Sequence, residues 1–217
     1  MPDHITHQSL AGAVALLVLL GLVVTALAAG LTRRRWPLAL VAAAIGGGVF
    51  QLGHFAEHVA QAGYWLAHRS DAPWMTPWAS SLASSFGRLA TGTPGFGMEA
   101  LHLTGNMIFL GGATAIAVVI SRGGRPDARR PARLGVAVQG LHVLEHVALT
   151  ATVLAGGPAR GLSTLFGTLD PGPGLWTYRV WWHLTINAIG TVALAVALAR
   201  WRRTTVASGR ARPALAV

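Results

Sequence analysis

Five long apolar stretches dominate the chain, and segments rich in arginine, glycine, proline and serine separate them. A helix needs roughly 20 apolar residues to cross the hydrocarbon core of a bilayer. The stretches that meet this requirement are residues 10–29, 38–66, 98–120, 134–155 and 180–199. The pattern therefore predicts an all-α integral membrane protein with five transmembrane helices.

Composition supports residence in the lipid bilayer and indicates an orientation. Only 11% of the residues are charged, against roughly 25% in soluble domains. Every basic residue is an arginine, and all but Arg69, Arg88, Arg160 and Arg179 follow the first, third or fifth stretch. The positive-inside bias then predicts an outer N-terminus and a cytoplasmic C-terminus, in the plasma membrane of a bacterium. Arginines clustered between apolar runs argue against nucleic-acid binding, and the absence of cysteine excludes thiolate chemistry.

An internal duplication covers the last four stretches. The motif QxxHxxEHVA occurs at residues 51–60 and again at 139–148, and the motif HLTxN occurs at 102–106 and at 183–187. The repeating unit is helix, outer loop, helix, and both copies have the same orientation. We therefore predict a four-helix bundle of two parallel repeats, preceded by one anchor helix. The predicted organisation is 1–35 for the outer segment and anchor helix, 36–120 for repeat 1, 121–203 for repeat 2, and 204–217 for a disordered cytoplasmic tail.

The spacing of the polar residues places them on one face of each helix. Residues at i, i+3, i+4 and i+7 lie on the same side of an α-helix, and lipid disfavours an outward polar stripe. The stripes should therefore meet inside the bundle, in the outer half of the membrane. The residues that we expect to bind metal there are His54, Glu57, His58, His102, His142, Glu145, His146 and His183.

Imidazoles and carboxylates on facing helices are an established way to hold two metal ions. We expect three histidines on each ion, with Glu57 and Glu145 bridging or capping the ions and shuttling protons. The carboxylates favour iron, zinc or manganese over copper(I). We expect iron, with zinc and copper as alternatives, and histidines on neighbouring helices also suit haem. Side chains expected to orient the imidazoles are Gln51, Gln139, Asn106, Asn187, Thr104 and Thr185. Glu99, three residues before His102, is either an additional ligand or an interfacial charge.

These features predict a metal-dependent membrane oxidoreductase that acts on a lipophilic or small substrate and is supplied by an electron donor. A zinc-dependent intramembrane hydrolase is an alternative, in which Glu57 or Glu145 is the general base. A protein for metal transport or sensing and a haem electron carrier are the non-enzymatic alternatives. The sequence does not specify an oligomeric state.

Overall fold

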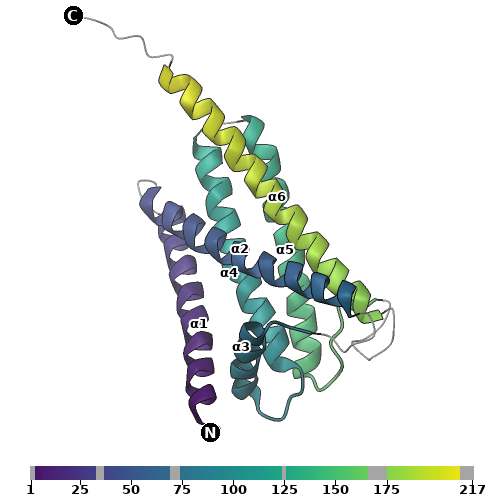
Figure 1. The fold of residues 1–217 in the computed structure, drawn as a ribbon. Coiled ribbons are helices and arrows are strands. Elements are labelled where there is room, and N and C mark those ends of the chain that lie inside the picture. Colours follow the sequence, from purple (N-terminus) through teal and green to yellow (C-terminus); the bar gives the residue numbers. More distant parts are fainter. Residues whose placement is uncertain (1–2, 33–36, 69–73, 124–125, 166–174, 211–217) are drawn as a thin grey trace, which may run out of the picture.

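The computed structural model describes residues 3–32, 37–68, 74–123, 126–165 and 175–210, and within these ranges it contains helices and no strand. Figure 1 shows the path of the chain. The α-helices are α1 (Asp3–Thr32), α2 (Pro37–Ala67), α3 (Pro77–Gly87), α4 (Phe96–Arg122), α5 (Pro126–Leu154) and α6 (Leu175–Arg210). Two 3₁₀ turns, η1 (Arg88–Ala90) and η2 (Leu162–Thr164), complete the described structure.

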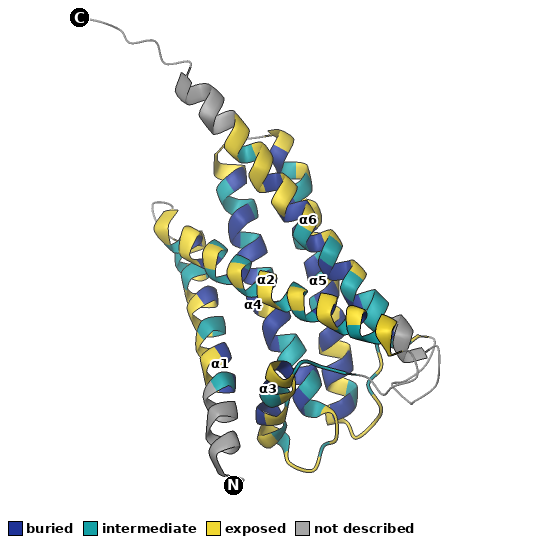
Figure 2. Ribbon diagram, in the orientation of Figure 1, coloured by how far each residue is buried: buried dark blue, intermediate teal, exposed yellow. Residues whose placement is uncertain are grey.

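Each of the five apolar stretches forms one long helix, as predicted. The helices α1, α2, α4, α5 and α6 are all long and apolar enough to cross a membrane. Their exposed faces are strongly apolar, because Leu38, Val49 and Leu144 are 80%, 64% and 68% exposed, whereas Asn106 and Gln139 are fully buried. Figure 2 shows exposed positions alternating with buried ones along the long helices. Apolar residues outside and amides inside are the arrangement that a lipid environment favours.

Four of the long helices pack in a closed ring. Helix α4 contacts α2 and α5, and α6 contacts the same two helices on the other side. Helix α1 lies outside this ring against α2 and α4, and the short α3 fits against α1 and α4 (Figure 1). Because α3 and the start of α1 lie at the same end of the molecule, we call this the α3 end.

Helices α2 and α4 cross in very close contact at two glycines. A Cβ atom on Gly47 would lie 2.6 Å from the Cα atom of Gly112, closer than real Cβ atoms approach any neighbour. Small residues allow two helix backbones to approach in this way. Ile108 and Ala43, both fully buried, flank the crossing.

The structure differs from the sequence expectation in two segments. Part of the first outer loop forms α3, because the Thr76 hydroxyl accepts a hydrogen bond from the Ala79 amide at 3.2 Å and Pro77 begins the helix. Its buried residues recur with helical spacing at Ala79, Leu82 and Phe86. The expected tail at residues 204–217 is helical up to Arg210, since no proline interrupts α6 before Pro213. Residues 211–217 lie outside the described ranges.

Candidate metal centre

Six histidines from the four bundle helices gather in two groups of three. In each group, the three candidate ligand nitrogens lie within 4.8 Å of one another, and the groups are His54, His58 and His102, and His142, His146 and His183. We call them the first and second triads. The first triad comes from α2 and α4, and the second from α5 and α6, so each repeat supplies one triad.

The spacing of the nitrogens suits a metal ion. The Nε2 atoms of His54 and His58 are 3.1 Å apart, and the Nε2 atom of His146 lies 3.2 Å from those of His142 and His183. Two nitrogens bound tetrahedrally to one ion at about 2.0–2.1 Å would be about 3.3 Å apart. Three buried histidine nitrogens, Nδ1 of His54, His142 and His146, lack a hydrogen-bond partner among the described residues. Both triads therefore fit a transition metal that prefers imidazole.

The two triads lie side by side. The rings of His58 and His183 stack with centroids 5.6 Å apart, and those of His102 and His146 stack at 5.3 Å. The duplication makes His58 equivalent to His146 and His102 equivalent to His183, so these two stacks are equivalent contacts. Six imidazoles consequently form one continuous cluster with the two-fold pattern of the sequence.

Backbone carbonyls orient one histidine of each triad. The Nδ1–H groups of His102 and His183 donate to the carbonyl oxygens of Met98 and Arg179, each at 2.8 Å. His58 donates from Nδ1 to the side-chain oxygen of Gln61 at 3.1 Å. With Nδ1 used in this way, the Nε2 atom of each ring presents its lone pair to the cluster, as in metal-binding histidines.

Four of the predicted orienting residues form crossed pairs between the repeats. Gln51 donates to Asn187 at 3.0 Å, and Gln139 donates to Asn106 at 2.8 Å. Each asparagine in turn donates to the carbonyl oxygen of the histidine one turn earlier. These amides link α2 to α6 and α4 to α5, and among the described residues no hydrogen bond joins them to an imidazole nitrogen. The two threonines differ, since Thr104 is buried and Thr185 is exposed.

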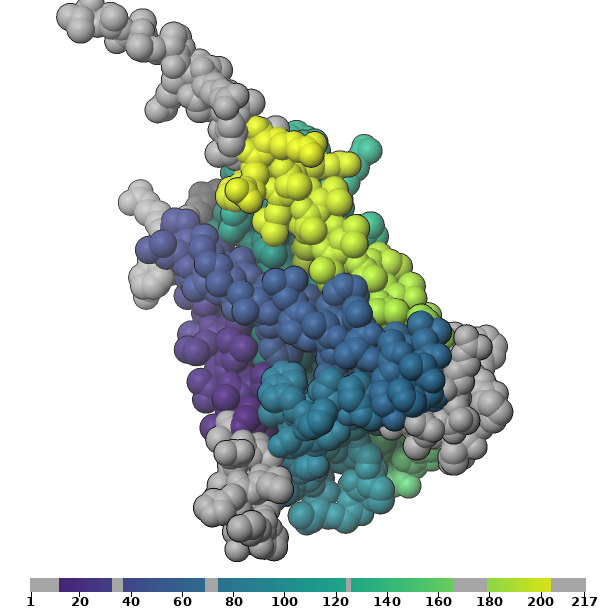
Figure 3. Space-filling model, in the orientation of Figure 1, coloured from purple at the N-terminus to yellow at the C-terminus, as the bar shows by residue number. Residues whose placement is uncertain are grey.

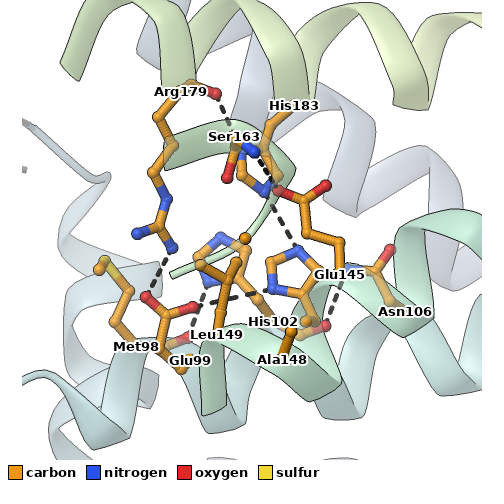
Figure 4. A network of polar contacts seen from close by, with 12 residues as sticks. Met98, Glu99, His102, Asn106, Glu145, Ala148, Leu149, Ser163, Arg179 and His183 are labelled. Atoms are coloured by element: carbon orange, nitrogen blue, oxygen red, sulfur yellow. Dashed lines mark hydrogen bonds and ion pairs between the residues drawn. The ribbon is translucent and has the colours of Figure 1, made fainter. Parts of the chain in front are cut away.

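The structure places the two glutamates of the repeated QxxHxxEHVA motif against the outer loops. Glu57 accepts hydrogen bonds from the Thr76 amide at 2.9 Å and the Thr76 hydroxyl at 2.6 Å. Glu145 accepts from the Ser163 amide at 2.7 Å (Figure 4). It also accepts from the Trp182 indole at 2.5 Å. Neither carboxylate belongs to a triad. Each glutamate is instead hydrogen-bonded to the outer loop of its own repeat, at Thr76 for Glu57 and at Ser163 for Glu145.

One buried ion pair was not anticipated as a pair by the sequence analysis. Arg179 donates to Glu99 at 2.6 Å, and both side chains are almost completely buried (Figure 4). The second oxygen of Glu99 lies 3.8 Å from Nδ1 of His146, and neither atom has a hydrogen-bond partner among the described residues. The duplication places Met98 and Val180 at the equivalent positions, so this pair distinguishes the second triad from the first. The sequence did carry a signal for this ion pair: Glu99 and Arg179 have opposite charges and lie at or next to the starts of the apolar stretches 98–120 and 180–199.

Comparison with known proteins identifies the family. Residues 2–213 match the model of a family of unknown function (DUF6008), and the chain belongs to that family. No curated protein and no solved structure matches the chain.

Proposed function

We propose that this protein is an integral membrane oxidoreductase in which each histidine triad holds one redox-active metal ion. The observation that carries the proposal is the pair of adjacent three-histidine groups, one from each repeat. Three protein ligands leave coordination positions open, whereas structural metal sites are closed by a fourth ligand. The ions would supply electron transfer and bind a small oxidant at these positions.

The arrangement of the glutamates alters the expectation about the metal. Because Glu57 and Glu145 are hydrogen-bonded to the outer loops, the proposed ligand set contains only imidazoles. Imidazole suits copper as well as iron, and the argument that carboxylates favour iron loses weight. We therefore propose iron or copper, with the glutamates as supports of the loops that cover the centre.

Three alternatives receive less support from the geometry. A zinc hydrolase needs a glutamate free to act as base, but Glu57 already accepts three hydrogen bonds and Glu145 accepts two. A haem needs a flat space between axial histidines, and here every imidazole packs against at least two others. A transport path needs polar side chains toward the arginine-rich end, where the described core is apolar around Ile108 and Phe109.

The expected orientation would place the centre near the outer surface. His102 lies in the second turn of α4, and α4 begins at the α3 end of the molecule. The positive-inside bias assigns this end to the outside of a bacterial plasma membrane. We propose that an electron donor reaches the centre from this side.

The metal content of the purified protein tests the proposal. We expect two iron or copper ions per chain in detergent, without a haem absorption band. His54→Ala and His142→Ala should each lose about one ion, whereas His68→Ala, at an exposed position outside both triads, should retain both. Absence of bound metal after reconstitution would overturn the proposal. A single zinc would favour the hydrolase, and a strong Soret band would favour haem.

A further inference from the structure

We propose that an apolar cavity beside the first triad binds the substrate, and that the substrate presents an alkyl group of about six carbon atoms. This inference rests on the proposed function, because it assigns the substrate class and the reacting side of that metal centre. It makes the two triads unequal: the first faces the substrate, and the second is more deeply buried.

The cavity has a volume of about 170 Å³ and lies between α1, α2, α3 and α4. Its only ionisable wall residues are His54, Glu57 and His102, at one side. Apolar residues that form the rest of the wall include Leu16, Val49, Phe50, Trp78, Ala79 and Leu82. An apolar cavity of roughly 150 Å³ remains free of water and binds benzene. The volume and the wall therefore match a six-carbon apolar group placed against two ligands of one triad.

The duplication explains why a cavity of this size lies beside the first triad, whereas the cavity that His183 of the second triad lines has a volume of only about 60 Å³. Gly53 and Gly105 line the cavity, and the equivalent residues of repeat 2 are Leu141 and Ile186. A Cβ atom on Gly53 would meet no atom within 4 Å, so this glycine faces open space. His54 and His102 are partly exposed as a result, whereas all three histidines of the second triad are buried.

Helix α1, which precedes the repeats, and helix α3, which lies in the outer loop of repeat 1, complete the cavity. Helix α1 contributes Leu16 and helix α3 contributes Ala79 and Leu82, and repeat 2 packs against no comparable pair of helices within the described ranges. Figure 3 shows α3 filling the angle between α1 and α2. Val49 and Trp78 also belong to the wall, and they are 64% and 59% exposed on the outer surface. Single side chains such as Val49 and Trp78 thus separate the cavity from the apolar exterior, and an alkyl chain would enter from there.

A photoreactive six-carbon alkyl diazirine provides the test. The purified full-length protein is labelled in detergent, and mass spectrometry locates the modified residues. We expect labelling of Leu82 or Ala79, which are only 4% and 3% exposed and so are shielded from detergent. Gly53→Leu, which copies repeat 2, should fill the cavity and abolish this labelling. Gly140→Leu is the matched control, because it makes the same change in α5 outside the cavity and copies Leu52 of repeat 1.

Labelling of Leu82 or Ala79 that is unaffected by Gly53→Leu, or no labelling of either residue, would overturn the inference. Ala79→Leu adds side-chain volume to the same cavity from α3 and replaces Gly53→Leu if that variant fails to fold. Metal content is measured on the same samples. Labelling that depends on Gly53 in a protein without metal would refute the proposed function alone, while two bound ions without such labelling would refute this inference alone.

Discussion

Replacing Arg179 by methionine removes the cation that neutralises the buried carboxylate of Glu99. Breaking a buried ion pair at one partner typically costs about 3–5 kcal/mol, because an uncompensated charge remains. In a protein of 150–250 residues, each kcal/mol lowers the unfolding temperature by about 2–4 °C. We therefore expect Arg179→Met to lower that temperature by at least about 6 °C. Glu99→Val should have an effect of similar size.

The duplication supplies the matched double variant. Met98 and Val180 occupy the equivalent positions, so Glu99→Val with Arg179→Met gives each position the residue type that its counterpart in the other repeat already carries. Apolar replacement of both partners of a buried pair is often neutral or stabilising. The unfolding temperature of the double variant should therefore return to within about 3 °C of the original protein.

The double variant should regain thermal stability but not metal affinity. In the original protein, the second oxygen of Glu99 faces Nδ1 of His146 at 3.8 Å and can orient this ring. Loss of such a supporting carboxylate typically weakens metal binding by about 10–100-fold. The double variant should consequently fold normally and release one of its two ions to a competing chelator more readily.

The assay is thermal unfolding in detergent, followed with and without chelator, together with chelator titration of the bound metal. If either single variant unfolds within about 2 °C of the original protein, the buried ion pair does not contribute the stability that an uncompensated buried charge would cost. A double variant as unstable as the worse single variant would also refute the reasoning. Unchanged metal affinity in the double variant would show that Glu99 does not support His146.

Two further predictions concern the packing around the centre. Gly112→Ala should separate α2 from α4 and destabilise the protein, because its Cβ atom would lie 2.7 Å from the Cα atom of Gly47; Gly140→Ala, whose Cβ atom meets no neighbour, is the control in the same unfolding assay. Thr76→Val should detach the first outer loop, since it removes the hydroxyl that caps α3 and donates to Glu57. We expect a loss of about 1–3 kcal/mol and faster proteolysis between α2 and α3, and equal protease resistance of variant and original protein would contradict this.

The sequence predicted the six histidines as one cluster because their positions follow local rules. Helical spacing defines a polar face from the sequence alone, and an apolar surrounding forces that face inward. The duplication then showed which polar residues share a position in both repeats. Helix α3 was missed because its four buried positions, one of them a serine, lie in a short segment rich in serine, where the periodic signal is weak.

The sequence by itself determined the five long helices, the two repeats and the inward direction of the histidines, because chain length, composition and periodicity are local properties. Only the tertiary structure decided how the histidines divide into two triads, where the glutamate carboxylates bind, and which triad lies beside a cavity. Helical periodicity gives the side of the helix on which a side chain lies, but it does not determine which neighbouring helix or loop that side chain contacts. That choice depends on how the helices are rotated against each other, and on which loop amide or hydroxyl lies nearest to Glu57 and Glu145.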